Sequence, residues 1–135
     1  MKVVALANQK GGVGKTTTTI NLGAYLASEG KRVLIVDIDP QGNAGSGLGL
    51  EIAEEKHTIY GWLLGEEKIA PIQKTKETRL DIIPANIDLS GFEIDVRDAA
   101  NRDFILKERL ATLKEDYDFV LIDCPPSLGV LTINA

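Results

Sequence analysis

Cysteine, histidine and aromatic residues are scarce in this chain of 135 residues, in which aromatic residues make up only 5%. Cys124 is the one cysteine, so no intrachain disulfide can form, which fits a reducing compartment. A small buried residue is the interpretation we adopt for Cys124. His57, the one histidine, stands in a polar stretch, and we assign it no metal.

Long apolar runs and an excess of positive charge are also missing. No stretch approaches the roughly 18 apolar residues that a membrane-spanning helix needs, and the N-terminus has no signal-peptide layout. We therefore expect a cytoplasmic protein with no membrane partner. Lys and Arg number 15 against 20 Asp and Glu, which gives a net charge of −5. This balance argues against a general nucleic-acid-binding surface but leaves room for a local basic patch.

The residues that are present have the composition of a globular domain, with 44% apolar and 26% charged residues. Short apolar runs of the kind found in buried strands alternate with helical patterns, and four glycines between residues 40 and 49 predict an irregular loop. The run from Val3 to Ala7 predicts a strand buried on both faces. This alternation predicts an α/β fold with a parallel sheet flanked by helices. The expected strands are 3–7, 33–36, 80–83 and 119–122, and the expected helices are 16–30, 58–64 and the later part of 95–117.

A glycine-rich segment, Lys10-Gly11-Gly12-Val13-Gly14-Lys15-Thr16, lies between the first expected strand and the first expected helix. This context and composition predict a phosphate-binding loop, because glycines let successive backbone N–H groups point into one hollow beside a helix N-terminus. Lys15 would place its charge on the β- and γ-phosphates, and the Thr16 hydroxyl would bind Mg²⁺. Gln9 stands where the standard pattern has its first glycine, so the motif is a deviant one with Lys10 as a second lysine.

This segment has two other interpretations. A solvated glycine turn is disfavoured because strand, glycines, Lys-Thr and helix all agree. A dinucleotide-binding turn would use Gly12 and Gly14, with Asp37 on a ribose. It is disfavoured because Thr17 occupies the third glycine position and Lys15-Thr16 has no place in that fingerprint.

Acidic residues follow two of the expected strands. Asp37 and Asp39 come after the strand at 33–36, and Asp123 comes after the strand at 119–122. Ligands of open parallel sheets bind beyond the carboxyl ends of the strands, where the glycine loop also begins. Asp39 is therefore expected to orient an attacking water, and Asp123 to act on Mg²⁺. Asp37 is expected to do no more than hold the loop.

Three segments together resemble the deviant Walker A ATPases of the ParA/Soj and MinD type. KGGVGKT at 10–16 is similar to their signature loop, DIDPQGN at 37–43 to their switch I segment, and FVLIDCPPSL at 119–128 to their Walker B and switch II. The PQGN wording points to the ParA/Soj partitioning branch rather than to MinD-like division-site ATPases. The resemblance implies a P-loop ATPase sheet.

What the resemblance implies for the site is carried over residue by residue. The loop binds ATP, with Mg²⁺ held by Thr16 and, through water, by Asp123. Asp39 positions the hydrolytic water, and the signature lysine Lys10 reaches the phosphates of a partner chain in a nucleotide sandwich dimer. Catalytic roles thus fall to Lys10, Lys15 and Asp39. The ATP-binding residues are Lys10, Gly11, Gly12, Val13, Gly14, Lys15, Thr16 and Thr17.

The resemblance also implies slow ATP hydrolysis in chromosome or plasmid segregation. An ATP-bound homodimer would bind DNA non-specifically at the nucleoid and would release it when a ParB-type partner stimulates hydrolysis. Family members are about twice as long, so we expect residues 1–135 to be the N-terminal part of a single ATPase domain, truncated before its C-terminal strands. Little DNA binding is expected of these residues alone, given their charge of −5.

Truncation suggests two further expectations. A strand at 3–7 whose neighbours are missing would expose an apolar edge and cause non-native dimers, domain swapping or aggregation. The main alternative to an ATPase is a nucleotide-binding or self-associating fragment without turnover.

Overall fold

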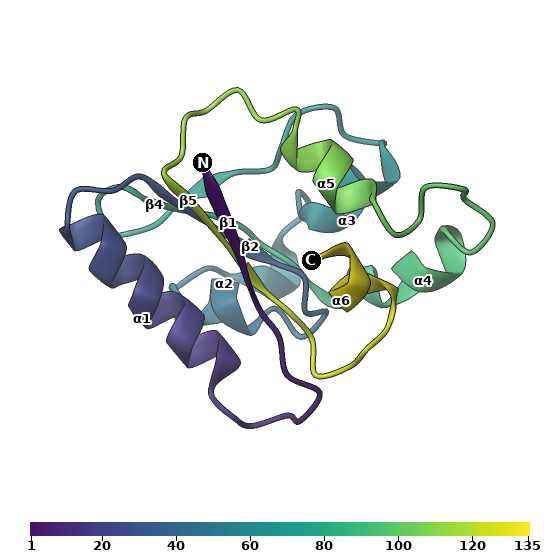
Figure 1. The fold of residues 1–135 in the computed structure, drawn as a ribbon, viewed down its shortest axis with the longest axis horizontal. Coiled ribbons are helices and arrows are strands. Elements are labelled where there is room, and N and C mark those ends of the chain that lie inside the picture. Colours follow the sequence, from purple (N-terminus) through teal and green to yellow (C-terminus); the bar gives the residue numbers. More distant parts are fainter.

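The computed structural model describes residues 1–135 as a five-stranded sheet between two layers of helices (Figure 1). The strands are β1 (Lys2–Leu6), β2 (Val33–Asp37), β3 (Gln73–Lys74), β4 (Leu80–Ile83) and β5 (Phe119–Asp123). The α-helices are α1 (Lys15–Ser28), α2 (Asn43–Gly47), α3 (Ile59–Leu64), α4 (Phe92–Asp95), α5 (Ile105–Leu110) and α6 (Val130–Asn134). Two 3₁₀ turns are η1 (Ile52–Glu54) and η2 (Ile87–Gly91). None of the helices has the length and apolar character that crossing a membrane requires.

The sheet has the strand order β1-β5-β2-β4-β3. Neighbouring strands are parallel except β3, which pairs antiparallel with β4. The parallel α/β fold predicted from the sequence is therefore confirmed. The two-residue β3 has no apolar run, and for that reason the pattern did not reveal it. In this register Asp37 lies beside Asp123, and Asp123 lies beside Leu6, so the carboxyl ends of β1, β5 and β2 meet at one edge.

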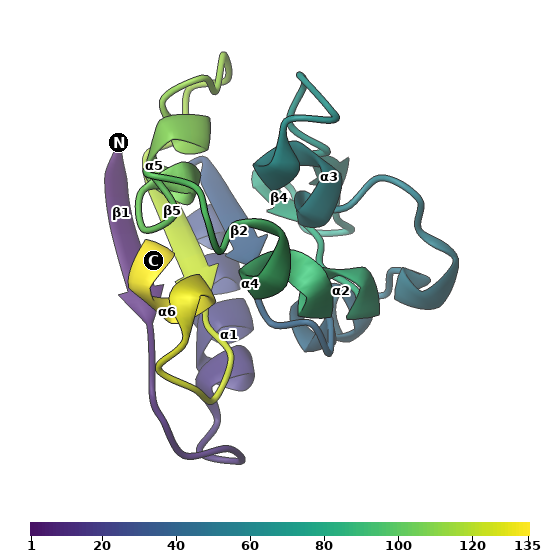
Figure 2. The same ribbon diagram turned by 90° about the vertical axis from the view of Figure 1, so that its right-hand side faces the viewer.

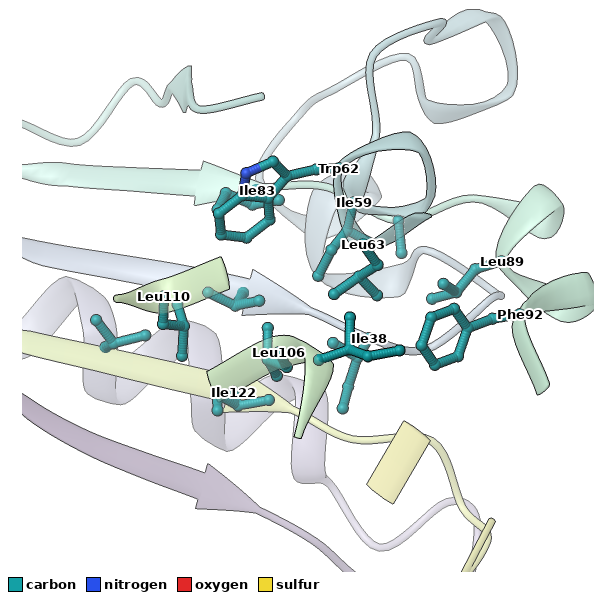
Figure 3. Close-up of a cluster of buried hydrophobic side chains, with 14 of the residues drawn as sticks. Ile38, Ile59, Trp62, Leu63, Ile83, Leu89, Phe92, Leu106, Leu110 and Ile122 are labelled. Carbon is teal, nitrogen blue, oxygen red and sulfur yellow. The ribbon is translucent and has the colours of Figure 1, made fainter. Parts of the chain in front are cut away.

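Each face of the sheet has its own apolar core. On one face α1 and α2 cover side chains of β2, β4 and β5 that include Ile35, Leu80 and Leu121. On the other face α3, α5 and the segment around η2 and α4 cover a larger cluster that surrounds Trp62 and Phe92 (Figure 3). Because both faces are covered, β2 is buried at every position, which explains its unbroken apolar sequence.

Two helix ends agree with the glycine signals in the sequence. Helix α1 ends at Ser28, and Gly30 follows with a φ of 84°, the left-handed conformation that ends helices. Helix α3 ends at Leu64, and Gly65 follows with a φ of 81°. Both helices therefore end within two residues of the predicted positions.

The expected loop at residues 40–49 contains a short helix, α2, so that prediction was wrong. The carboxylate of Asp37 accepts a hydrogen bond from the Ala44 N–H in the first turn of this helix (3.2 Å). Gly45 lies inside this helix where it packs against η1: a Cβ at this position would lie 2.3 Å from Ile52 Cδ1, so a larger residue would require the Ile52 side chain to move. A glycine that indicates a loop in isolation can thus also lie in a closely packed helix.

The helix expected in the later part of 95–117 is also shorter than predicted. Helix α5 spans only six residues, and turns occupy the positions before it. The Leu106 N–H does not donate to a preceding helical turn. It donates instead to the side-chain oxygen of Asn134 in α6 (3.0 Å). A contact with a segment distant in sequence thus sets where α5 begins.

Strand β1 differs most from its sequence-based prediction. It pairs only with β5 and forms one edge of the sheet, as Figure 2 shows. Val3 is 43% exposed, so the strand is not buried on both faces. The apolar run specified a strand, but the number of neighbours is a property of the assembled sheet.

Candidate functional site

The phosphate loop joins the carboxyl end of β1 to the N-terminus of α1. Gly12 and Gly14 have φ values of 70° and 85°, which only glycine adopts without strain. Backbone N–H groups from Gly11 to Thr17 donate no hydrogen bond within the chain. A row of free donors at the positive end of a 14-residue helix is a site for an anion.

The loop forms one wall of a cavity of about 440 Å³. Asp39, Gln41, Asn43 and Pro126 line the same cavity from the segments after β2 and β5. The structure therefore brings together two regions, 10–17 and 37–43, that the sequence analysis placed at one sheet edge. Lys10 does not line this cavity.

The two lysines of the loop have different positions. Lys15 lines the cavity, and its ammonium group donates a hydrogen bond to the Lys10 carbonyl oxygen across the loop (3.3 Å). The backbone of Lys10 is held by the Asn8 side chain, which accepts its N–H (2.9 Å). Lys15 is thus in place to meet an anion in the cavity, whereas Lys10 lies exposed outside it.

Asp123 lies at the end of β5, behind the loop, and is fully buried. Its carboxylate accepts a hydrogen bond from the Thr16 hydroxyl (2.7 Å), and the Thr19 hydroxyl lies 3.4 Å from its other oxygen. Burial raises the pKa of Asp123, and repulsion from Asp39 raises it further, while the Thr16 hydrogen bond lowers it. The raised pKa marks a carboxylate for which a positive charge would be a favourable neighbour.

Asp37, by contrast, faces inward and is fully buried. It accepts hydrogen bonds from the backbone N–H groups of Asp39 (2.9 Å) and Ala44 (3.2 Å). Burial raises the pKa of Asp37 well above its usual range, and the neighbouring Asp123 and Asp39 raise it further. These contacts agree with the expectation that Asp37 holds the loop while Asp39 lines the cavity.

A Mg²⁺ ion fits the residues at this position. The Thr16 hydroxyl and the Asp123 carboxylate are adjacent oxygen groups, and Mg²⁺ prefers oxygen ligands while keeping several waters. No group of three or more acidic, histidine or cysteine side chains forms a complete metal cage anywhere in the structure. The ion would therefore be held jointly by Thr16, by water and by phosphate oxygens, with Asp123 beside it.

Sequence reasoning missed four residues of this site. Gln41 and Asn43 belong to the DPQGN segment and line the cavity, but no role was assigned to them. Pro126 lies against the loop: a Cβ on Gly11 would be 3.7 Å from its Cβ. Thr19 is buried one helical turn beyond Lys15, and its hydroxyl donates to the Lys15 carbonyl (2.8 Å). The helical spacing of Thr16 and Thr19 was the available signal for Thr19.

A larger hollow of about 730 Å³ adjoins this cavity and shares Gln41 with it. Glu54, Glu55 and Asp88 line the hollow, with Lys56 as its single cation. Acidic walls repel phosphate groups. The smaller cavity, with its free N–H groups, is the better candidate for an anionic ligand.

Three residues to which we assign no functional role are Cys124, Trp62 and His57. Cys124 is buried, and burial raises the pKa of its thiol to about 11, so it is a packing residue. Trp62 is fully buried in the larger core. His57 lies 3.2 Å from Glu67 through Nδ1.

A protein-family model and two characterised relatives match this chain along nearly its whole length. A family model described as an AAA domain (AAA_31) matches residues 1–135. The chain is 55% identical over 135 residues to the sporulation initiation inhibitor protein Soj of Bacillus subtilis, covering 99% of this chain and 53% of that protein. It is 51% identical over 138 residues to the chromosome partitioning protein ParA of Caulobacter vibrioides, covering 100% of this chain and 52% of that protein.

One similar solved structure carries a nucleotide and a metal. It is described as cobyrinic acid a,c-diamide synthase from Mycobacterium smegmatis with a bound ATP analogue and magnesium. It is 47% identical, with a TM-score of 0.94 over 99% of this chain and 53% of that one. The chain thus spans about half the length of the relatives it matches.

Proposed function

The chain belongs to the AAA domain family and is of the ParA/Soj type, and from this premise we propose that it binds ATP and Mg²⁺ at the phosphate loop and hydrolyses ATP slowly. The observation that carries the proposal is the cavity where free loop N–H groups, Lys15 and Asp39 meet. The nucleotide-bound solved relative supports the choice of ligand.

Binding of the phosphates falls to the loop. The free N–H groups of residues 11–17 would bind phosphate oxygens, and Lys15 would exchange its hydrogen bond to Lys10 for contact with the β- and γ-phosphates. Thr16 would contribute its hydroxyl to Mg²⁺, and the bound ion would neutralise phosphate charge. Thr16 donates its proton to Asp123, which would leave its oxygen lone pairs for the ion.

Hydrolysis needs a water aligned with the γ-phosphate. Asp39 is 8% exposed, lines the cavity, and is fixed by the Gln41 N–H, which donates to its Oδ1 (3.0 Å). We assign to Asp39 the positioning of this water, with its free oxygen as the acceptor. Positioning and electrostatics supply most of the catalysis in phosphoryl transfer.

The role of Lys10 requires a second chain. Its side chain is exposed and does not line the cavity of its own chain. We infer that it contacts the phosphates bound by a partner in an ATP-dependent sandwich homodimer. This arrangement would place two cavities face to face and would make the dimer depend on nucleotide.

The cellular role follows from the relatives. The 55% and 51% identical proteins are named for sporulation control and chromosome partitioning. We propose that residues 1–135 are the N-terminal part of a single ATPase domain that acts in chromosome or plasmid partition. A ParB-type protein would stimulate ATP hydrolysis, and the dimer would bind non-specific DNA at the nucleoid. The similar solved structure is named as an amide synthase, a different activity on the same fold. We therefore base the proposed role in partition on the relatives named as partitioning proteins.

Calorimetric titration of this 135-residue chain with ATP·Mg²⁺ tests the binding step. Saturable binding is expected, and Lys15→Ala should weaken it at least about tenfold, the loss that one charge-assisted hydrogen bond explains. Lys68→Ala, which removes an exposed lysine remote from the cavity, is the matched control and should bind like the wild type. Equal affinity of the wild type and Lys15→Ala would overturn the proposal.

Turnover separates an ATPase from a module that only binds nucleotide. Phosphate release by the wild type should fall about 100-fold or more in Asp39→Ala while ATP binding persists. Binding without any turnover would favour the alternative function, a nucleotide-binding fragment. Loss of nucleotide-dependent dimers in Lys10→Ala, with monomer binding intact, would support the role given to that lysine.

A further inference from the structure

We propose that a second cavity, of about 210 Å³ at the amino end of the sheet, binds a phosphate group. It lies where β2 and β4 begin, whereas the cavity beside the phosphate loop, from here on the nucleotide cavity, lies beyond the carboxyl ends of the strands. The proposal is independent of ATP binding, because no residue lines both cavities.

The charge in this cavity is opposite to that of the chain. Four cations line it against two carboxylates, so the local sum is 4 − 2 = +2, in a chain with a net charge of −5. The cations are Arg32, Lys74, Lys76 and Arg79, and the carboxylates are Glu77 and Asp81. A concave cluster of like charges attracts an ion of the opposite sign.

The one buried carboxylate here already has partners. Asp81 lies 2.8 Å from the Lys74 ammonium group and accepts a hydrogen bond from the Tyr117 hydroxyl (2.8 Å). Arg32 and Arg79 take part in none of the four ion pairs of the structure. Two arginines therefore line this cavity without an ion-pair partner. Guanidinium groups match phosphate oxygens in a bidentate manner.

Arg32 is held in place by its surroundings. Its guanidinium carbon lies 5.6 Å from the ring centroid of Tyr117, a residue that is 5% exposed. Its backbone N–H donates to the Asp118 carboxylate (2.8 Å), and its carbonyl accepts from the Asp118 N–H (2.8 Å). The Arg32 backbone and its contact with the Tyr117 ring are therefore already in place, and binding of a phosphate would require little further loss of conformational freedom.

Arg79 has an unusual backbone. Its φ of 69° is the only value in the left-handed region at a residue other than glycine. Such a conformation is strained at a residue with a side chain, and surrounding contacts must maintain it. The Thr75 hydroxyl closes the turn by donating to the Leu80 carbonyl (2.7 Å), and the Arg79 carbonyl accepts the first N–H of β2 from Val33 (2.9 Å). The turn thus keeps an arginine at the cavity where a glycine would be easier.

A phosphate group could come from two sources, a free anion or the backbone of a nucleic acid. NMR titration of the full chain is best done with the Lys15→Ala variant. This substitution removes the main cation of the nucleotide cavity and leaves the cavity at the amino end of the sheet unchanged. Inorganic phosphate should shift the backbone amide signals of residues 75–79 saturably. Competition by a short DNA duplex at the same amides would identify the backbone source, and no effect of the duplex would identify the free anion.

Matched variants test the assignment. Arg79→Gly accepts the positive φ without strain, so it should keep its Tm while losing about tenfold in phosphate affinity. Arg32→Gln should lose a similar factor. Arg97→Gln, in which a 72% exposed arginine elsewhere is changed, should bind like the wild type. Unchanged affinity in both Arg79→Gly and Arg32→Gln, or shifts scattered outside residues 75–79, would overturn the proposal.

Discussion

Strands β1 and β2 are each five residues long, and both have an apolar core of valine, leucine, isoleucine or alanine. Strand β2 is buried at all five positions, between β5 and β4 and beneath helices on both faces. Strand β1 contacts one neighbour, and Val3 is 43% exposed. Similar sequences thus occupy the interior and the edge of the same sheet.

The difference indicates that β2 contributes mainly to the stability of the chain and β1 mainly to its association with other chains. A buried strand contributes through the area it removes from water, and this contribution is lost when side chains are shortened. An edge strand contributes less to the chain but presents unpaired N–H and C=O groups to other chains. Near β1, a cavity of about 500 Å³ is lined by apolar residues that include Met1, Phe104 and Ile133.

The largest difference between β1 and β2 should appear in the stability lost when one side chain in each strand is shortened. Ile35→Ala in β2 should lower the free energy of unfolding by about 2–5 kcal/mol, because it leaves a cavity in a filled core. Val3→Ala in β1 should cost about 0.5 kcal/mol. Urea unfolding followed by the fluorescence of the buried Trp62 measures both. Equal losses in the two variants would contradict the division between interior and edge.

Charge at the edge should change association more than stability. The wild type is expected to self-associate through the β1 edge as its concentration rises, and Val3→Lys should shift the chain toward monomer. A lysine on an edge strand is solvated in the monomer, so the unfolding free energy should change by about 0.5 kcal/mol or less. Sedimentation velocity at several concentrations, without nucleotide, provides the measurement. A wild type that stays monomeric until ATP is added would sink this prediction.

The smallest effect is expected from the acids at the strand ends. The folded-state pKa of Asp123 is raised, so the folded chain holds its proton more tightly than the unfolded chain does. The free energy of unfolding should therefore fall as the pH rises from the ordinary value of 3.8 through the raised pKa. Asp37 contributes with the same sign.

Asp123→Asn should remove part of this pH dependence and make the nucleotide-free chain more stable at neutral pH, by about 1 kcal/mol or less. An amide keeps the Thr16 hydrogen bond but carries no charge to repel Asp39. Urea midpoints at several pH values between 4 and 8 would test the change in slope. A steeper fall with pH in Asp123→Asn than in the wild type would contradict it.

Much of the nucleotide cavity could be predicted from the sequence because local rules specify its parts. The glycines at 12 and 14, the lysine and threonine that follow, and the helix behind them act within one short segment. The acids at 39 and 123 could be placed because parallel strands end at a common edge. Gln41 and Asn43 were missed because lining a cavity depends on how the loop folds over the sheet.

The amino-acid sequence by itself determined four of the five strands, the glycine loop and the sheet edge at which a ligand would bind, since these depend on periodicity and local backbone freedom. Tertiary structure alone decided which apolar strand became an edge, how glycines at 45 and 47 came to form a helix, and where distant arginines share a cavity. The physical reason is that burial, close packing and the summation of charge are properties of neighbours in space, and Arg32 and Arg79 become neighbours only when β2 and β4 pair.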